Sequence, residues 1–337
     1  MGSVIPLKKT INSSYNELRN LVGEKLQKVE SLVEEKLKSR INLIEKMSNH
    51  HLSSGGKRLR ALLTLGSAKL TGYQLGERDI NFAACVELIH AATLLHDDVI
   101  DESKIRRGVK TCNTIWGNQS SILLGDYLLS RCFEIMVEDG DLNILKLLSS
   151  TSAKIAQGEI LQLQHKNESD LLEDTYIKII SLKTASLFSA ATKTGACVSG
   201  CSEKEKNALE SYGKNLGLAF QIADDALDYH SVEKIFGKKV GTDFFEGKAT
   251  LPIIILSQRA NDAEKKKLSE IFKKRERDNL DLENILKFIK KYNVVDECFD
   301  RAKYFVNVSR DALSIFENSE EKRVLQGISF FSLNRKF

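Results

Sequence analysis

Residues 94–101 read Leu-Leu-His-Asp-Asp-Val-Ile-Asp, and they end an apolar stretch whose spacing is typical of a helix. A second cluster with the same D-D-x-x-D spacing spans residues 224–228 and follows another apolar stretch. Residues one helical turn apart share a face, so Asp97 projects beside Asp101, and the second cluster repeats this arrangement. Like charges repel within each cluster. Two such clusters around one cavity predict a site for several Mg²⁺ ions, whose remaining ligands would be phosphate oxygens.

Composition and the spacing of apolar residues predict one large all-α domain over residues 1–337. Apolar positions recur at three- and four-residue intervals, alternating strand patterns are scarce, and the chain contains only two prolines, Pro6 and Pro252. The 42% of hydrophobic residues supply a large core. We therefore expect a helical bundle around a deep central cavity. Long helices are expected near 11–48, 78–102, 113–138, 172–198 and 203–231.

Charge and cysteine usage exclude several classes of protein. The net charge of +4 is too small to indicate a nucleic-acid partner, and basic residues alternate with acidic ones. The six cysteines form no C-x-x-C pair, which indicates free thiols in a reducing compartment. The first nine residues lack the apolar run of a signal peptide, and no run of about 18 apolar residues predicts a membrane-spanning helix. We expect a soluble, cytoplasmic protein.

Three basic segments complete the pattern. Residues 55–60, here called the basic loop, read Gly-Gly-Lys-Arg-Leu-Arg and precede an apolar helix, whose first N–H groups attract anions. Arg106 and Arg107 follow the first aspartate cluster, and the segment 237–248 contains three glycines and three lysines. Each segment alone also fits a solvated surface turn. Together with two aspartate clusters, they indicate a site for diphosphate groups.

These motifs resemble those of the trans-isoprenyl diphosphate synthases, or polyprenyl synthetases, and they follow the order of that family from about residue 50 to residue 255. The matching segments are Gly55–Arg60, Leu94–Asp101, Arg106–Gly108, Lys183–Thr184, Phe220–Asp228 and Gly237–Pro252. A single D-D-x-x-D is common by chance, whereas this ordered set is specific. Ala61 departs from the usual proline, which would only stiffen a helix start. The pattern is most similar to that of long-chain octaprenyl and decaprenyl diphosphate synthases.

The resemblance implies a Mg²⁺-dependent, head-to-tail condensation of isopentenyl diphosphate with an allylic diphosphate, such as farnesyl or geranylgeranyl diphosphate. The fold would be the all-α bundle of the isoprenoid synthases. About three Mg²⁺ ions would neutralise the departing diphosphate. Their ligands would come from the aspartates Asp97, Asp98, Asp101, Asp224, Asp225 and Asp228.

The same resemblance assigns other polar residues to the two substrates. The allylic diphosphate, or the cation beside it, would contact Arg106, Lys183, Thr184, Gln221, Lys238 and Lys248. Isopentenyl diphosphate would be held by Lys57, Arg60, His90 and Arg107. His90 lies two helical turns before Asp97 and shares its face, although a lone histidine is more often structural. The catalytic set would be Asp97, Asp98, Asp101, Arg106, Lys183, Asp224 and Lys238.

Thr93 and Ala92, four and five positions before Asp97, lie about one helical turn below the metal site. Short-chain members of the family have an aromatic plug at one of these positions, and none is present here. The resemblance therefore implies an open tunnel, and at about 5.4 Å per turn a floor several turns deeper would admit about eight to ten isoprene units. Such a product would serve as a quinone side chain, as in ubiquinone. Small residues could instead serve close helix packing.

Other functions explain fewer of these motifs. A shorter-chain farnesyl or geranylgeranyl diphosphate synthase would share the chemistry and differ in the tunnel. A class I terpene cyclase has no use for the basic loop, and a non-catalytic regulatory subunit of a heteromeric synthase would lack some of the aspartates. A di-metal helical bundle needs two Glu-x-x-His pairs, and only Glu87 with His90 forms a plausible one.

We expect a homodimer, because the segment 113–138 has apolar residues on more than one helix face. These residues are Ile115, Ile122, Leu123, Tyr127, Leu128, Phe133 and Ile135. Peripheral contact with a membrane would suit the release of so apolar a product, although the sequence contains no anchor.

Overall fold

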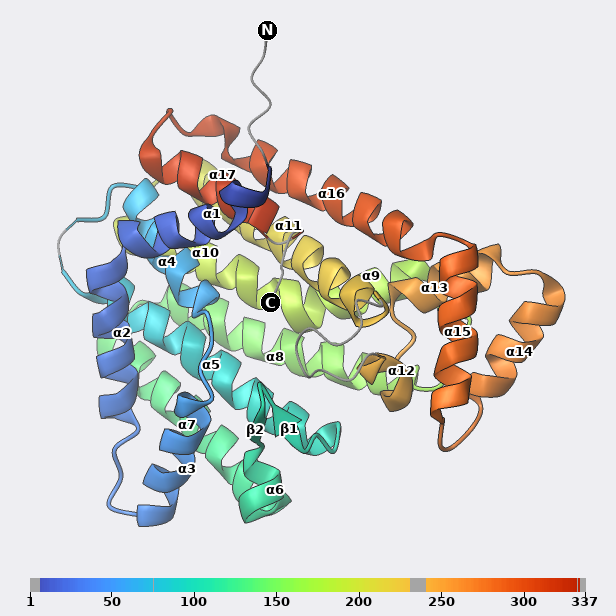
Figure 1. Cartoon of the computed structure of the whole chain (residues 1–337). Coiled ribbons are helices and arrows are strands. Elements are labelled where there is room, and N and C mark those ends of the chain that lie inside the picture. Colours follow the sequence, from blue (N-terminus) through green and yellow to red (C-terminus); the bar gives the residue numbers. More distant parts are fainter. Residues whose placement is uncertain (1–6, 75, 231–240, 332, 334–337) are drawn as a thin grey trace, which may run out of the picture.

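The computed structural model describes residues 7–74, 76–230, 241–331 and 333, and this part of the chain is almost entirely helical (Figure 1). The helices are α1 Leu7–Leu21, α2 Gly23–Lys36, α3 Asn42–Ser53, α4 Leu59–Leu70, α5 Arg78–Ile100, α6 Cys112–Trp116, α7 Asn118–Asp139, α8 Leu142–Gln164, α9 Glu173–Ile180, α10 Ser186–Ser199, α11 Glu203–Asp228, α12 Thr242–Glu246, α13 Leu251–Arg259, α14 Asp262–Phe272, α15 Asn279–Lys291, α16 Val294–Ala312 and α17 Glu320–Phe331. The predicted all-α bundle is confirmed.

Three short elements depart from the regular helices. The strands β1 Ile105–Arg106 and β2 Val109–Lys110 form an antiparallel hairpin directly after α5. A π-helical turn, η1 Ser181–Ala185, joins α9 to α10, and a 3-10 turn, η2 Leu313–Ile315, follows α16. A π-helical turn shifts the register of a helix and is frequent at functional sites, so the residues of η1 are candidates for the functional site.

Helix α10 lies at the centre of the bundle, in contact with α4, α5, α8 and α11 (Figure 1). Helix α5 also packs against α7, and α11 packs against α16. Two clusters of buried apolar side chains fill the interior, one around α4, α5 and α7 and the other around α13, α15 and α16. None of the helices in the described ranges has both the length and the apolar character that crossing a bilayer requires.

Two of the predicted helices are wrong in their extent. The segment 11–48 does not form one helix, because α1 ends at Leu21 and α2 begins at Gly23, a residue with low helix propensity. A second break follows α2, where the backbone N–H of Ile41 donates to the Ser39 hydroxyl at 3.1 Å instead of continuing a helix. The predicted helix over 113–138 is divided into α6 and α7 at Gly117, whose φ is 84°. The predicted helix over 172–198 forms without a break, as α9, η1 and α10.

Close packing of α11 against α10 and η1 depends on two glycines one turn apart. A Cβ on Gly217 would lie 2.6 Å from Cα of Ala185 in η1. A Cβ on Gly213 would likewise collide with Thr192 and with the carbonyl of Phe188. These glycines let the backbones approach, and they place the C-terminal half of α11 directly beside η1.

Candidate active site

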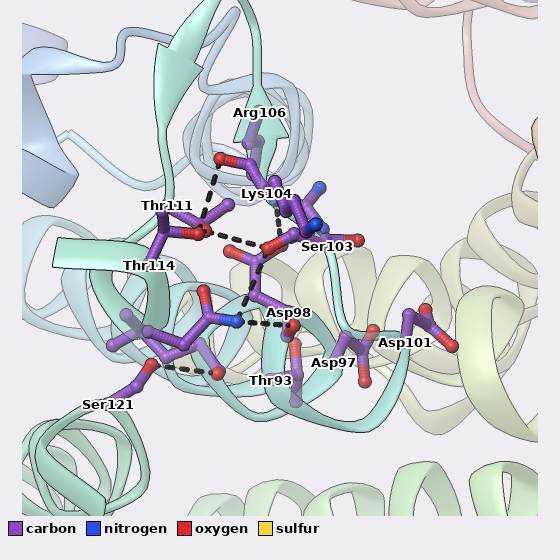
Figure 2. Close-up of polar contacts among 12 residues, drawn as sticks. Thr93, Asp97, Asp98, Asp101, Ser103, Lys104, Arg106, Thr111, Thr114 and Ser121 are labelled. Atoms are coloured by element: carbon purple, nitrogen blue, oxygen red, sulfur yellow. Dashed lines mark hydrogen bonds and ion pairs between the residues drawn. The ribbon is translucent and has the colours of Figure 1, made fainter. Parts of the chain in front are cut away.

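The first aspartate cluster lies at the C-terminal end of α5, and its carboxylates point in two directions (Figure 2). Asp97 and Asp101 project to one side, as a separation of one helical turn requires. Asp98 points toward the β1–β2 hairpin, where its Oδ1 accepts a hydrogen bond from Nε of Arg106 at 2.9 Å and forms an ion pair with Nη2 at 2.8 Å. Only 2% of Asp98 is exposed. The structure thus brings two of the three predicted carboxylates together and pairs the third with Arg106.

The β1–β2 hairpin connects this cluster to the basic loop. Arg106 lies against Asp98, whereas the guanidinium of Arg107 donates to the carbonyl oxygen of Gly55. A Cβ on Gly56 would lie 2.7 Å from Nη1 of Arg107, and Gly56 has a φ of 153°. The backbone conformation therefore favours glycine at position 56, and a side chain there would also displace the guanidinium of Arg107.

Glu87 of α5 fixes the end of the basic loop. Its Oε1 accepts a hydrogen bond from the backbone N–H of Ala61 at 3.1 Å, in the first turn of α4. Its Oε2 lies 3.6 Å from Nη1 of Arg58, whose φ of 48° is left-handed. Glu87 is only 6% exposed, and a carboxylate at a helix N-terminus satisfies otherwise unpaired N–H groups. Arg58 is consequently turned toward Glu87.

His90, also on α5, lies beside Arg60. Nη1 of Arg60 is 3.2 Å from Nε2 of His90. Burial lowers the pKa of His90 well below its ordinary value, and the charges of Arg60 and Arg107 act in the same direction. Because a guanidinium only donates, the network assigns Nε2 as an acceptor and the proton of the neutral ring to Nδ1. His90 thus orients Arg60 without adding a charge.

The side chain of Lys57, also in the basic loop, contacts α17. Its Nζ lies 4.8 Å from the ring centroid of Phe331, and its carbonyl oxygen accepts a hydrogen bond from the hydroxyl of Tyr15 at 2.9 Å. The terminal helices α1 and α17, which pack against each other, therefore support the basic loop.

The second aspartate cluster ends α11, and its central member is turned into the protein. Asp225 is 3% exposed; its Oδ2 accepts from the hydroxyl of Tyr176 and its Oδ1 from Nε2 of Gln221, both at 2.6 Å. Oε1 of Gln221 in turn accepts from the hydroxyl of Thr184 at 2.9 Å. Asp224 is half-buried. A hydrogen-bonded chain therefore runs from α9 through α11 to η1.

Lys183 of η1 lies next to the first aspartate cluster. Its ammonium group forms an ion pair with Glu159 of α8, donates to Oε1 of Gln162 at 2.9 Å and lies 4.0 Å from Oδ2 of Asp97. Helix α8 can approach so closely because a Cβ on Gly158 would lie 2.7 Å from the backbone nitrogen of Lys183. The ammonium is thus shared between a buried acid and the site.

The segment around α12 connects the two aspartate clusters. Nζ of Lys248 lies 2.8 Å from Oδ2 of Asp101 and 2.8 Å from Oε2 of Glu246. The backbone N–H of Asp243 donates to Oδ2 of Asp228 at 2.9 Å. The same short segment therefore contacts one carboxylate of each cluster.

A pocket of about 610 Å³ opens among these groups. Its polar lining consists of Gln162, His165, Tyr176, Lys183, Thr184, Gln221, Asp225, Asp243, Lys248 and Thr250. Cationic lysines beside carboxylates can bind an anion and a cation together, as a metal–diphosphate complex requires.

Burial disfavours the charged form of two of the aspartates. It raises the pKa of Asp97 to about 6, with Lys183 opposing the shift and Glu159 adding to it. Burial also raises the pKa of Asp225 to about 7, although the hydrogen bonds from Tyr176 and Gln221 oppose it. A carboxylate whose ionised form is disfavoured gains strongly from a nearby cation. Within the ranges that the structure describes, no three carboxylate, histidine or cysteine side chains form a ready-made metal site.

A family model for the polyprenyl synthetases matches residues 41–289. The chain belongs to this family. An octaprenyl diphosphate synthase from Haemophilus influenzae is 35% identical over 334 residues, which cover 98% of this chain and 100% of that relative. The crystal structure of a decaprenyl diphosphate synthase from Rhodobacter capsulatus matches with a TM-score of 0.90 at 37% identity, and the match covers 95% of this chain and 98% of that one.

This polyprenyl synthetase is therefore a prenyltransferase with the all-α fold of the isoprenoid synthases, as the motifs predicted. Its relatives differ in their products. A geranylgeranyl diphosphate synthase from Methanosarcina mazei is 33% identical over 297 residues, which cover 87% of this chain and 90% of that relative. Family membership thus establishes the reaction class but does not establish the length of the product.

The structure places the other predicted residues of this polyprenyl synthetase as follows. Ala92 is fully buried in α5, and the hydroxyl of the half-buried Thr93 donates to the carbonyl oxygen of His90 at 2.8 Å. Lys238 lies outside the described residues.

Sequence reasoning missed several residues that shape the site of this synthetase. The sequence shows Glu87 only as the partner of His90 in a Glu-x-x-His pair, and it does not indicate the contact of Glu87 with the start of α4. No local pattern identifies the others, which reach the site only through tertiary packing. They are Glu159, Gln162, Tyr176 and Asp243.

Proposed function

We propose that this chain is a trans-polyprenyl diphosphate synthase that adds isopentenyl diphosphate repeatedly to farnesyl or geranylgeranyl diphosphate. The observation that carries the proposal is the separation of two anion sites by α5 and its hairpin. Lys183 and Lys248 gather with the aspartates at one site, and Arg60 and Arg107 gather at the basic loop. Two diphosphates could thus bind at once, with the reacting carbons between them.

Mg²⁺ fits the oxygen donors of Asp97, Asp101 and Asp224, because this ion is usually held by one or two carboxylates together with substrate phosphates. When bound, about three such ions would stabilise the negative charge of the departing diphosphate. Asp98 and Asp225 are only 2% and 3% exposed, and both accept hydrogen bonds from neighbouring side chains. We therefore assign Asp98 to positioning Arg106 and Asp225 to positioning Gln221, rather than to metal binding.

The residues of η1 and the hairpin would serve the leaving group. Arg106, Lys183 and Lys248, together with Lys238, supply cations where negative charge develops as the allylic C–O bond breaks. The hydroxyl of Thr184 donates its proton to Gln221, so it presents only lone pairs to the site. Lone pairs suit the allylic carbon, which becomes positively charged.

The basic loop would hold the second substrate. Lys57, Arg60 and Arg107 supply positive charge, and neutral His90 orients Arg60. The double bond of isopentenyl diphosphate then attacks the allylic cation and forms the new C–C bond. Loss of a proton to the released diphosphate restores a double bond, and the lengthened product can react again.

Ala92 and Thr93 would set the length of the product. Both lie on α5 below Asp97, and neither has a ring that could block a descending chain. With no plug at this level, we propose a product of octaprenyl to decaprenyl length, of the kind attached to quinones.

Replacing Ala92 with phenylalanine is expected to shorten the product to about three or four isoprene units, since an aromatic ring one turn below Asp97 fills the path of the chain. Mass analysis of the dephosphorylated products measures this. Ala91→Phe is the control, because Ala91 lines a separate cavity of about 1170 Å³ on another face of α5. An unchanged distribution in the Ala92 variant would remove Ala92 from the determinants of length.

A homodimer is the proposed assembly. Helix α7 exposes Leu123, Phe133 and Val137 at 66%, 44% and 67%, respectively. Large exposed apolar side chains on one helix are typical of an interface. Leu128 and Ile135 of the same helix are buried in the core, so its apolar residues lie on more than one face. Contact of the assembly with a membrane surface would serve the release of product.

A product analysis tests the proposed function. The purified protein is incubated with Mg²⁺, isopentenyl diphosphate and farnesyl diphosphate, and the dephosphorylated products are sized by mass. A dominant octaprenyl to decaprenyl product is expected. Products of three or four units would keep the reaction and refute the open tunnel, and a folded protein that elongates nothing would refute the proposed activity.

A further inference from the structure

We infer that Tyr176 is a positioning residue for the condensation, acting through Asp225 to fix the orientation of the Gln221 side chain. The inference rests on the proposed function, in which Gln221 and Thr184 face the allylic group. Tyr176 lies on α9, belongs to none of the sequence motifs, and is only 2% exposed.

The four side chains form one continuous series of hydrogen bonds. The hydroxyl of Tyr176 donates to Oδ2 of Asp225 at 2.6 Å, and Nε2 of Gln221 donates to Oδ1 of the same carboxylate at 2.6 Å. The hydroxyl of Thr184 donates to Oε1 of Gln221 at 2.9 Å. All four residues line the pocket of about 610 Å³. The series begins in the protein interior and ends at the site.

The direction of each hydrogen bond follows from donor chemistry. In its ionised form Asp225 only accepts, so both of its neighbours donate to it. The amide nitrogen of Gln221 therefore faces Asp225, and its oxygen faces Thr184. The reversed amide would bring the oxygen of Gln221 against a carboxylate oxygen and leave Thr184 without its acceptor. Tyr176 anchors this order, because it holds one oxygen of Asp225 and leaves the other directed at Gln221.

A second buried tyrosine offers a matched comparison. The hydroxyl of Tyr212 donates to the carbonyl oxygen of Leu325 at 2.7 Å, and Tyr212 is fully buried. It lies on α11 near α17 and does not line the pocket. Tyr212→Phe and Tyr176→Phe therefore each remove a buried, hydrogen-bonded tyrosine hydroxyl, and only the second touches the series that ends at the site.

The test compares Tyr176→Phe, Gln221→Leu and the double variant with the unchanged protein, with farnesyl diphosphate and isopentenyl diphosphate as substrates. Tyr176→Phe is expected to lower kcat by about tenfold, while KM for isopentenyl diphosphate stays unchanged. In the Gln221→Leu background the same change should alter kcat by less than about twofold, because residues that act through one another are not additive. Tyr212→Phe should lower the melting temperature and leave kcat unchanged.

Two results would overturn the inference while leaving the enzyme class intact. One is a full additional loss from Tyr176→Phe in the Gln221→Leu background. The other is a wild-type kcat in Tyr176→Phe when Gln221→Leu is impaired. Failure of the unchanged protein to elongate at all would refute the proposed function itself, so the two failures are distinguishable.

Discussion

Asp97→Asn is expected to lower kcat by about 10²–10³-fold, because the amide cannot supply the charge that holds a metal ion at the departing diphosphate. The same change should raise the melting temperature of the metal-free protein at pH 8. Burial raises the pKa of Asp97 to about 6, above its ordinary value of 3.8. Between these values the folded state binds more protons than the unfolded state, so stability falls as pH rises through this window and the loss persists above it.

Initial rates over a range of Mg²⁺ concentrations, together with melting curves at pH 8 without metal, measure both effects. Asp300→Asn is the control, because the Asp300 side chain is 70% exposed on α16 and pairs only with Lys303 among its described contacts. It should change neither quantity appreciably. Near-normal activity of Asp97→Asn would contradict its role in metal binding, and a fall in melting temperature would contradict the sign of the electrostatic effect.

Lys183→Met is expected to reduce both activity and stability. It removes a cation 4.0 Å from Asp97 and leaves Glu159, which is 7% exposed, as a buried acid without its ion-pair partner. Breaking such a pair from one side costs about 3 kcal/mol in the free energy of unfolding. The loss of the cation beside the leaving group should lower kcat by about 10²-fold.

The double variant Glu159→Gln with Lys183→Met separates these two effects. A neutral glutamine removes the buried charge, so chemical denaturation should show a stability close to that of the unchanged protein. The kcat should remain as low as in Lys183→Met. Recovery of activity along with stability would mean that Lys183 is needed only for folding.

The arrangement within each aspartate cluster was partly available from helix geometry. Residues 97 and 101 share a face, and residue 98 is turned by about 100° around the axis, so its separate direction follows from the helix itself. Its partner could not be predicted in the same way. Arg106 reaches Asp98 because the chain turns back in a two-stranded hairpin, and residues 105–110 have no strong strand pattern.

The contacts of the residues that support the site could not be predicted from the sequence for a different reason. Tyr176 and Asp225 are 49 positions apart, and their contact depends on how α9 packs against α11. Lys183 lies in η1 and pairs with Glu159 of α8, which Gly158 permits to approach closely. A π-helical turn has no sequence pattern as distinct as the D-D-x-x-D spacing, so its position had to come from the structure.

The β1–β2 hairpin has a consequence for how this chain can evolve. Its two adjacent arginines contact different parts of the site. Arg106 contacts Asp98 in the first aspartate cluster, and Arg107 contacts Gly55 in the basic loop. A deletion or insertion in this turn would therefore disturb the first aspartate cluster and the basic loop at once, although surface turns usually tolerate changes of length. Ala92 and Thr93, the proposed determinants of product length, belong to α5 and not to the hairpin. Substitutions at these two positions would therefore leave the length of the turn, and with it both arginine contacts, unchanged.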